Sequence, residues 1–257
     1  MIGLAHSIPP RFGARSRLCD TILPTAVADL KGLYVADASS IVLTVGVSQW
    51  SDTSGAGNHL TQPTGAMQPT WSATGWAGSK GGVLFDGTND LLHSTSAGLL
   101  TAFTGSDAPH TVLWGSEIVT NVTAKTHWSA NSTTPANNQN TRLRRGAGTV
   151  YQAARRDDAS TILDVNGTLT VDTLRRRHVL QHTGTAVSHW VDGAADINAG
   201  AQNVGVLTLQ RFTVGGLMQG ATPSERMNIR FRYLVVYARA LTATELAGLD
   251  CWAQGVA

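Results

Sequence analysis

Aromatic, imidazole and amide side chains gather in three polar segments of this sequence. The segments are 50–60 (WSDTSGAGNHL), 75–82 (GWAGSKGG) and 127–140 (HWSANSTTPANNQN). A tryptophan ring stacks on the C–H face of a sugar, and amides and imidazoles hydrogen-bond to sugar hydroxyls. We interpret the segments as exposed loops; the alternatives are a tight structural turn at 50–60 and burial of each tryptophan in the core. The expected ligand contacts are Trp76, His127, Trp128, Asn131, Asn138, Asn58 and His59.

A turn at residues 86–90 brings three oxygen-bearing side chains together, those of Asp86, Asn89 and Asp90. Oxygen ligands at this density can hold Ca²⁺. The turn lacks the full spacing of a calcium loop and has no bidentate glutamate, and its carboxylates can instead accept hydrogen bonds from the local amides. We therefore expect that no cofactor is required, with calcium at Asp86, Asn89 and Asp90 as the alternative.

Acid–base catalysis on a sugar needs two carboxylates that face each other across the scissile bond. The three glutamates, Glu117, Glu225 and Glu245, are far apart in the sequence. Asp157 and Asp158 are neighbours, and neighbouring residues of a strand face opposite sides of the sheet. No G-x-S-x-G nucleophile elbow and no H-E-x-x-H zinc motif is present in the sequence. We therefore expect that the chain is not an enzyme.

The composition indicates that strands and turns position these residues. The 257 residues include 27 Gly, and only 14% are charged, with three Lys and three Glu to coat helices. The segment 229–237 (IRFRYLVVY) alternates and then becomes continuously apolar, as a strand buried toward its end would. One helix is expected at the C-terminus, because Thr242 precedes Glu245 by three residues in a capping box.

The ends of the chain and its charge limit its partners. Residues 1–24, with Pro9, Pro10 and Pro24, predict an extended arm before a domain at 25–257. The arm either docks on another subunit or is a terminus that is held against its own domain or disordered. No apolar run is long enough for a membrane and none resembles a secretory signal, so we expect synthesis into a host cytoplasm. A net charge of +2 without a basic stripe does not indicate a nucleic-acid binder, so we expect no nucleic-acid partner. A disulfide between Cys19 and Cys251 is open, but without a signal we interpret both as reduced thiols.

Four blocks occur in an order that resembles a known domain family. They are WSDTSGAGNHL at 50–60, FDGTNDLL at 85–92, VDG at 191–193 and ALTATE at 240–245. Together they resemble the laminin-G-like jelly-roll domains of the concanavalin A-like superfamily, from about residue 30 to the C-terminus. The resemblance implies an all-β fold, a two-sheet antiparallel jelly-roll sandwich with one short C-terminal helix. It also implies binding of glycans or proteins at a rim or on a sheet, and calcium in some members.

Bacteriophage structural proteins use such domains, and the resemblance therefore implies a function by analogy of fold. We expect a non-catalytic virion surface protein, a head decoration, fibre or tail-associated subunit. Its expected partners are coat subunits and host cell-surface polysaccharide, and exposed sheet edges allow a homo-oligomer. The alternatives are a lectin-like carbohydrate-binding module and a carbohydrate-active enzyme without a recognisable motif.

Overall fold

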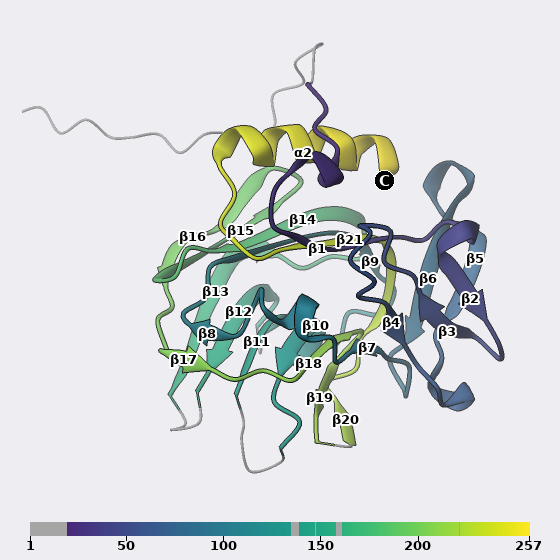
Figure 1. Cartoon of the computed structure of the whole chain (residues 1–257), viewed down its shortest axis with the longest axis horizontal. Coiled ribbons are helices and arrows are strands. Elements are labelled where there is room, and N and C mark those ends of the chain that lie inside the picture. Colours follow the sequence, from purple (N-terminus) through teal and green to yellow (C-terminus); the bar gives the residue numbers. More distant parts are fainter. Residues whose placement is uncertain (1–19, 135–138, 147, 158–160, 221) are drawn as a thin grey trace, which may run out of the picture.

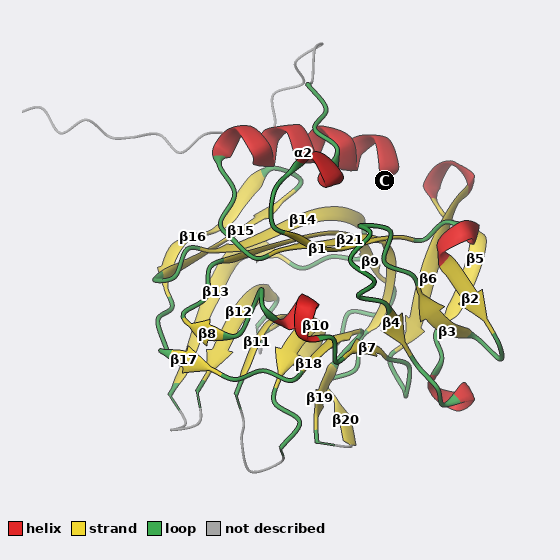
Figure 2. Ribbon diagram, in the orientation of Figure 1, coloured by secondary structure: helices red, strands yellow, loops and turns green. Residues whose placement is uncertain are grey.

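The computed structural model describes residues 20–134, 139–146, 148–157, 161–220 and 222–257. Two antiparallel sheets pack face to face, and the C-terminal helix lies across the outer surface of one of them (Figures 1 and 2). The prediction of an all-β, two-sheet antiparallel sandwich with a short C-terminal helix is confirmed.

Sheet A has eight strands. They are β1 (Leu30–Val35), β5 (Thr70–Trp76), β6 (Lys80–Asp86), β9 (His110–Ile118), β14 (Arg175–His182), β15 (Ala186–Val191), β16 (Ala194–Ala201) and β21 (Asn228–Tyr237). Their order is β16-β15-β14-β9-β21-β6-β5, and β1 pairs with β21. Strands β14–β16 and strands β5 and β6 are consecutive in the sequence, whereas the central pairings of β9 with β14 and of β21 with β9, β6 and β1 join distant parts of the chain.

Sheet B has nine strands in the order β13-β12-β11-β10-β18-β7-β4-β3-β2. Their bounds are β2 (Ile41–Leu43), β3 (Val47–Trp50), β4 (Leu60–Thr61), β7 (Leu92–Ser94), β10 (Lys125–Asn131), β11 (Asn140–Arg145), β12 (Val150–Arg156), β13 (Ile162–Thr170) and β18 (Arg211–Val214). Two small ribbons complete the strands: β8 (Gly105–Ser106) with β17 (Val206–Leu207), and β19 (Leu217–Gln219) with β20 (Thr222–Ser224). The short helix α1 (Ala97–Leu100) and four single 3₁₀ turns lie in the connections.

Strand β21 is apolar on both faces because both faces are covered. Phe231 and Leu234 point into the core between the sheets, whereas Tyr233 and Val235 point to the other side. A bulge in the pairing with β9 lies between Phe231 and Tyr233 and changes the face that successive residues occupy. The continuous apolar run in the sequence is therefore a strand between two hydrophobic layers.

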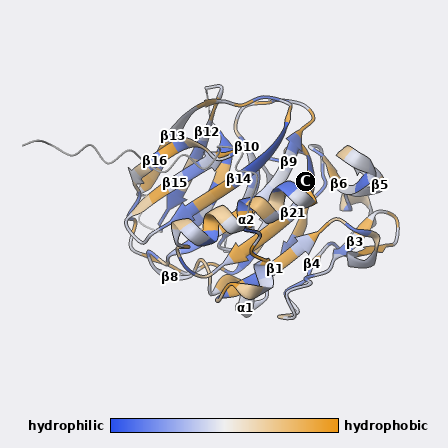
Figure 3. Ribbon diagram, turned by 90° about the horizontal axis from the view of Figure 1, so that it is seen from above, coloured by the Kyte–Doolittle hydropathy of each residue, from blue (hydrophilic) through white to orange (hydrophobic). Residues whose placement is uncertain are grey.

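Helix α2 (Ala243–Val256) supplies the second layer. Its first turn is closed by a capping box: Glu245 N donates to Thr242 Oγ1, and Thr242 N donates to the Glu245 carboxylate. Leu246, Leu249 and Ala253 face sheet A and pack on its outer apolar residues. Viewed from above, α2 lies over β14 and β21 (Figure 3). The capping box predicted from the sequence is confirmed.

The first described residues run beside α2. Ile22 N donates to Gly248 O over 3.1 Å, and Tyr237 Oη donates to Pro24 O over 3.0 Å. Cys251 of α2 is disulfide-bonded, so the interpretation of the cysteines as reduced thiols is wrong. Cys19 and the rest of 1–19 lie outside the described residues, and the division into an arm at 1–24 and a domain at 25–257 stays a prediction.

The two outer surfaces of the sandwich differ. Helix α2 covers the outer surface of sheet A. The outer surface of sheet B is crossed near β10 by the β19–β20 ribbon, where Ser129 Oγ donates to Gly216 O over 3.0 Å. Beyond the ribbon, side chains of β11, β12 and β13 form the surface.

Candidate functional site

The run 127–131 is a strand and not a loop. His127, Trp128 and Asn131 lie in β10, and none of the three has measurable exposure. Trp128 points into the core, with its ring 5.9 Å from those of Phe103 and Phe212. The expectation of exposure at Trp128 is wrong, because the polar residues after it suggested a loop while its own segment pairs with β11 and β18.

Trp76 is also buried. It is the last residue of β5, is 3% exposed, and lies under the guanidinium of Arg175, 5.6 Å from the ring centroid. The expectation that Trp76 is an exposed stacking platform is therefore wrong. Asn138 lies outside the described residues.

The loop at 50–60 is organised by one carboxylate. Asp52 accepts hydrogen bonds from the amides of Ser54 (2.9 Å) and Asn58 (3.0 Å). The Asn58 side chain is buried and donates to Lys31 O over 2.7 Å, so it holds the loop against β1. His59 is exposed at the surface, and its Nδ1 accepts from Asp52 N over 3.0 Å. The alternative interpretation of a tight structural turn describes this segment, and ligand contact at His59 stays a prediction.

The oxygens of the 86–90 turn serve the turn itself. Asp86 Oδ1 accepts from the amides of Thr88 (2.7 Å), Asn89 (3.1 Å) and Asp90 (3.3 Å). Burial alone would raise the pKa of Asp86, but these amide hydrogen bonds outweigh it and lower the pKa. Burial raises the pKa of Asp90 to about 6. Within the described part of the chain no three His, Cys, Asp or Glu residues are grouped to hold a metal. Calcium at Asp86, Asn89 and Asp90 stays a prediction.

A network of polar side chains lies inside the sandwich. His189 Nδ1 is 2.7 Å from Asp196 Oδ2, and His189 Nε2 is 3.3 Å from His178 Nδ1. Asp196 Oδ1 also accepts from the amides of Thr168 (2.8 Å) and Leu169 (2.7 Å). His178, His189 and Asp196 of this interior network are buried, and they bond to one another and to the backbone of β13.

Further buried imidazoles extend the interior network. Trp114 Nε1 donates to His127 Nδ1 over 3.3 Å, and the Trp114 ring stacks on that of His178 at 4.7 Å. Arg155 Nη1 lies 3.0 Å from Asp107 Oδ1 and 2.9 Å from His182 Nε2. Burial, followed by the charge of His189, lowers the pKa of His127 to about 3, and burial and Arg155 lower that of His182 to about 4. His127 and His182 are therefore neutral at pH 7.

The outer surface of sheet B carries a second polar group, which we call the polar face. Residues that pair directly across antiparallel strands point to the same side of the sheet. One row of pairs runs Thr126–Arg144–Gln152–Asn166 across β10 to β13, and a neighbouring row brings Arg142 and Asp164 to the same side. The polar face consists of Thr126, Arg142, Arg144, Gln152, Asp164, Asn166 and Glu225.

Arg144 is at the centre of the polar face. Its Nη2 lies 3.0 Å from Asp164 Oδ2, and its Nε donates to Gln152 Oε1 over 2.5 Å. Gln152 Nε2 in turn donates to Asn166 Oδ1 over 2.8 Å. Arg144 Nη1 lies 3.6 Å from Glu225 Oε1. The guanidinium is therefore fixed on three sides by strand residues and the adjoining loop.

Glu225 reaches the polar face from the connection between β20 and β21. Its Oε1 lies 3.0 Å from Arg142 Nη1, and its Oε2 accepts from Thr126 Oγ1 over 2.6 Å. Its backbone has φ of +48°, in the left-handed region that non-glycine residues rarely adopt. Such backbone strain persists where surrounding contacts enforce it, and it often marks functional sites.

The charge on this surface is positive. The pairing also places Arg156 and Arg211 on this side, so four arginines share the surface with the carboxylates of Asp164 and Glu225, and Arg142 and Arg144 pair with them. The Nε atoms of Arg142, Arg156 and Arg211 have no hydrogen-bond partner among the described residues. Burial lowers the pKa of Arg142, and the adjacent Glu225 raises it in part. Guanidinium groups bind carboxylates with charge-assisted hydrogen bonds.

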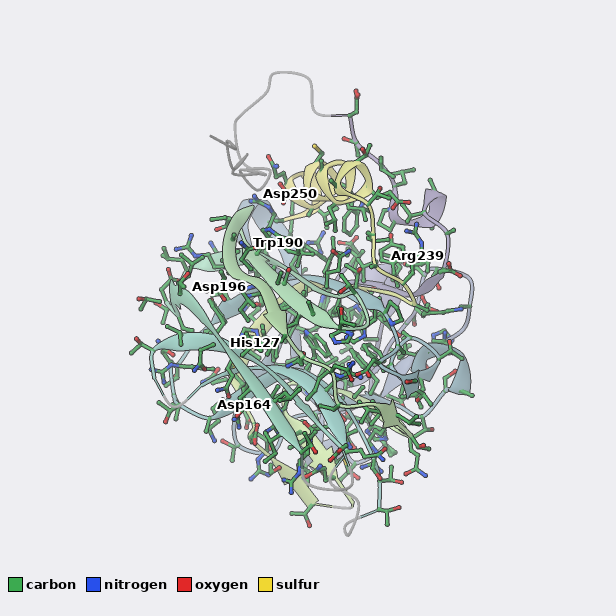
Figure 4. The ribbon with its side chains drawn as sticks, turned by 90° about the vertical axis from the view of Figure 1, so that its left-hand side faces the viewer. His127, Asp164, Trp190, Asp196, Arg239 and Asp250 are labelled. Carbon is green, nitrogen blue, oxygen red and sulfur yellow. The ribbon has the colours of Figure 1, made fainter. Side chains whose placement is uncertain are left out.

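The polar face was not predicted from the sequence. The runs NTRLRR (140–145) and VYQAARR (150–156) place arginines at alternate positions, which is the available signal. Figure 4 shows the vertical order of the labelled residues: Asp250 on α2 at the top, then Trp190 of sheet A, His127 between the sheets, and Asp164 of the polar face below. The polar face and α2 are thus on opposite sides of the sandwich.

No family model and no curated protein matches this chain. Among solved structures, Trypanosoma rangeli sialidase in complex with sialic acid matches with a TM-score of 0.64 and 15% identity, over 93% of this chain and 36% of the sialidase. Domain 4 of a GH43 extracellular arabinanase from Geobacillus stearothermophilus, in complex with arabinotriose, matches with a TM-score of 0.62 and 14% identity, over 86% of this chain and 98% of that domain. The binding domain of Paraclostridial Mosquitocidal Protein 1 matches with a TM-score of 0.57 and 12% identity, over 86% of this chain and 52% of that one.

The likenesses agree with a concanavalin A-like jelly-roll fold and correct one expectation. The expectation that the chain is not an enzyme is contradicted, because the proteins that share its fold include a sialidase and an arabinanase. At these identities the likeness shows the fold, and no activity follows from it. The attribution to phage structural proteins has no support from these structures. No helix in the described part of the chain is long and apolar enough to cross a membrane.

Proposed function

We propose that this chain is a carbohydrate-binding domain and that the polar face of sheet B holds the glycan. The observation that carries the proposal is the row of guanidinium, amide and carboxylate groups presented by rigid strands on the side of the sandwich opposite α2. Sugar hydroxyls both donate and accept hydrogen bonds, so they need arginine and amide donors beside carboxylate acceptors.

The arrangement has the preorganisation that binding requires. Arg144 is held by Gln152 and Asp164 before any ligand arrives, so little side-chain entropy is lost on association. The Asp164 side chain is 32% exposed, which leaves oxygens accessible to a hydroxyl. The likeness to a domain solved with arabinotriose supports the same class of ligand.

The lectin-like alternative is thus favoured over a virion surface protein. A virion location, contacts with coat subunits and a homo-oligomer stay predictions that only assembly experiments address. The disulfide at Cys251 fits an oxidising environment, such as a cell or particle surface.

The test is a glycan array probed with the full chain and two matched variants. Arg144→Ala removes the central guanidinium of the polar face, and Arg175→Ala removes a partly exposed, ion-paired arginine of sheet A. We expect Arg144→Ala to lose at least tenfold in affinity, which equals about 1.4 kcal/mol, and Arg175→Ala to bind as the parent chain does. The proposal fails if no glycan binds, or if Arg144→Ala binds unchanged.

A further inference from the structure

The ion pairs of the polar face point to the charge of its ligand. Glu225 Oε1 is shared between Arg142 Nη1 (3.0 Å) and Arg144 Nη1 (3.6 Å), while its Oε2 accepts from Thr126 Oγ1 (2.6 Å). One carboxylate therefore satisfies two guanidinium groups and a hydroxyl, and it comes from a connecting loop and not from the sheet. This is the set of donors that would recognise the carboxylate of an acidic sugar.

We propose, on the basis of the proposed function, that the glycan bears a carboxylate, which binds Arg142, Arg144 and Thr126 in the place held by the Glu225 carboxylate. Glu225 is then an internal competitor that an acidic sugar displaces. A neutral sugar would have no group that could take over these contacts.

Arg144 is held in place independently of Glu225. Arg144 Nε and Nη2 bond to Gln152 and Asp164, so only Nη1 is directed to Glu225. Arg142 extends from the same rigid strand, β11. The sheet therefore orients the Arg144 guanidinium independently of Glu225, whereas Arg142 Nη1 is paired with Glu225 and becomes available when that carboxylate leaves.

Glu225 can release its carboxylate without a change in the loop. Its carbonyl oxygen accepts from Thr126 N over 2.8 Å, which ties the loop to β10 independently of the side chain. The Glu225 side chain is 21% exposed, so its carboxylate can turn to solvent by rotation of side-chain bonds. The strained φ of +48° shows that the surroundings hold this residue at the polar face.

Asp164 does not have the same role. It belongs to β13 and pairs with Arg144 alone among the described residues. Its removal would leave Arg144 less well oriented, whereas removal of the Glu225 charge would free both guanidinium groups. Removal of the Asp164 carboxylate should therefore weaken the binding of an acidic ligand, whereas removal of the Glu225 charge should strengthen it.

The experiment measures affinity for sugars that differ only in a carboxylate, by calorimetry on the full chain. Oligogalacturonate is compared with its methyl ester and sialyllactose with lactose, and dextran sulfate tests charge without a carboxylate. We expect at least one acidic sugar to bind tenfold more tightly than its neutral counterpart and more tightly than dextran sulfate. Equal binding of the acidic and neutral members, or stronger binding of dextran sulfate, overturns the inference.

The variants test the competition itself. Glu225→Gln keeps the side-chain shape and is expected to raise affinity for the acidic sugar threefold to tenfold, whereas Arg142→Gln lowers it at least tenfold. The control is Glu117→Gln, because Glu117 of sheet A is also 21% exposed and pairs with two arginines, Arg175 and Arg230. It should bind as the parent does. Unchanged or weaker acidic binding by folded Glu225→Gln refutes the competitor role.

The two proposals fail in different ways. If no sugar binds at all, the carbohydrate-binding function itself is wrong. If neutral sugars bind through Arg144 while Glu225→Gln has no effect, the function stands and the preference for a carboxylate is wrong.

Discussion

The strands β10, β11 and β12 carry polar side chains on both of their faces, and the two faces use them differently. Facing inward, His127 and Arg155 belong to the enclosed interior network. Facing outward, Arg142, Arg144 and Gln152 belong to the polar face. Alternate residues of the same strands thus meet two environments, one dry and one in contact with water.

The comparison separates polar groups that stabilise the fold from polar groups that are available to a ligand. In the interior an unpaired donor or acceptor costs its full desolvation penalty, so each partner is indispensable. On the polar face Asp164 and Glu225 are partly exposed, so water can replace a partner that either carboxylate loses, and their ion pairs contribute little to stability. Interior bonds are therefore structural, and outer bonds are exchangeable.

The largest expected difference between the interior network and the polar face is in the free energy of unfolding at acid pH. Burial lowers the pKa values of His110, His127, His178 and His182 below that of an unfolded histidine, about 6.5. Below pH 6.5 the unfolded chain therefore binds more protons than the folded chain, and stability falls as the pH falls. The decline continues to about pH 4 for His182 and about pH 3 for His127.

A histidine that stays neutral in the folded chain costs up to about 1.4 kcal/mol of stability per pH unit, so His127 and His182 alone would remove a large part of an ordinary stability of about 5–15 kcal/mol between pH 6.5 and 4. Asp90 opposes the trend, because its raised pKa of about 6 makes the folded chain bind a proton more readily. Urea unfolding at half-unit pH steps measures the slope. A free energy of unfolding that stays level from pH 7 to pH 4.5 would contradict the neutral interior.

A second, smaller difference is expected between the stability costs of removing Asp196 and of removing Asp164. Asp196→Ala removes three hydrogen bonds in the interior, including the 2.7 Å contact to His189, and should cost about 3–5 kcal/mol. Asp164→Ala removes one ion pair of the polar face and should cost about 1 kcal/mol or less. Urea unfolding at pH 7.5 compares the two variants with the parent chain. Equal costs would show that the interior and outer groups are not energetically distinct.

The smallest expected effect is that of Arg144→Gln on stability. Although it abolishes two ion pairs, with Asp164 and Glu225, the loss should be less than about 1 kcal/mol, since water reaches both carboxylates. Its melting temperature should differ from that of the parent by a few degrees at most. A much larger drop would place the polar face among the structural groups and weaken its assignment to a ligand.

The sequence predicted the elements whose signals are local. The apolar run at 229–237 is β21, and Thr242 with Glu245 begins α2. Trp128 was misplaced because a strand that is buried on both faces does not alternate, and the polar residues after it suggested a loop. The signals that predict β21 and the start of α2 each extend over fewer than ten residues, which is the range in which sequence patterns are informative.

The candidate site depends on distant pairings and could not be predicted in the same way. Glu225 meets Thr126 from 99 residues away, and Arg144 meets Asp164 across two strand pairings. Each residue alone resembles an ordinary surface charge. Only the register of β11, β12 and β13 brings them together, and register is set by the packing of the whole sheet.

Asp196 has a consequence for self-association. Strand β13 is the edge of sheet B, and free amides on an edge strand are a template for pairing with another molecule. Asp196 takes up two such amides, those of Thr168 and Leu169, and Gly167 permits this approach because a Cβ there would lie 2.1 Å from the carboxylate. The side chain that anchors the buried imidazoles thus also caps the open edge of a sheet, so losing it would destabilise the fold and at the same time expose a surface for aggregation.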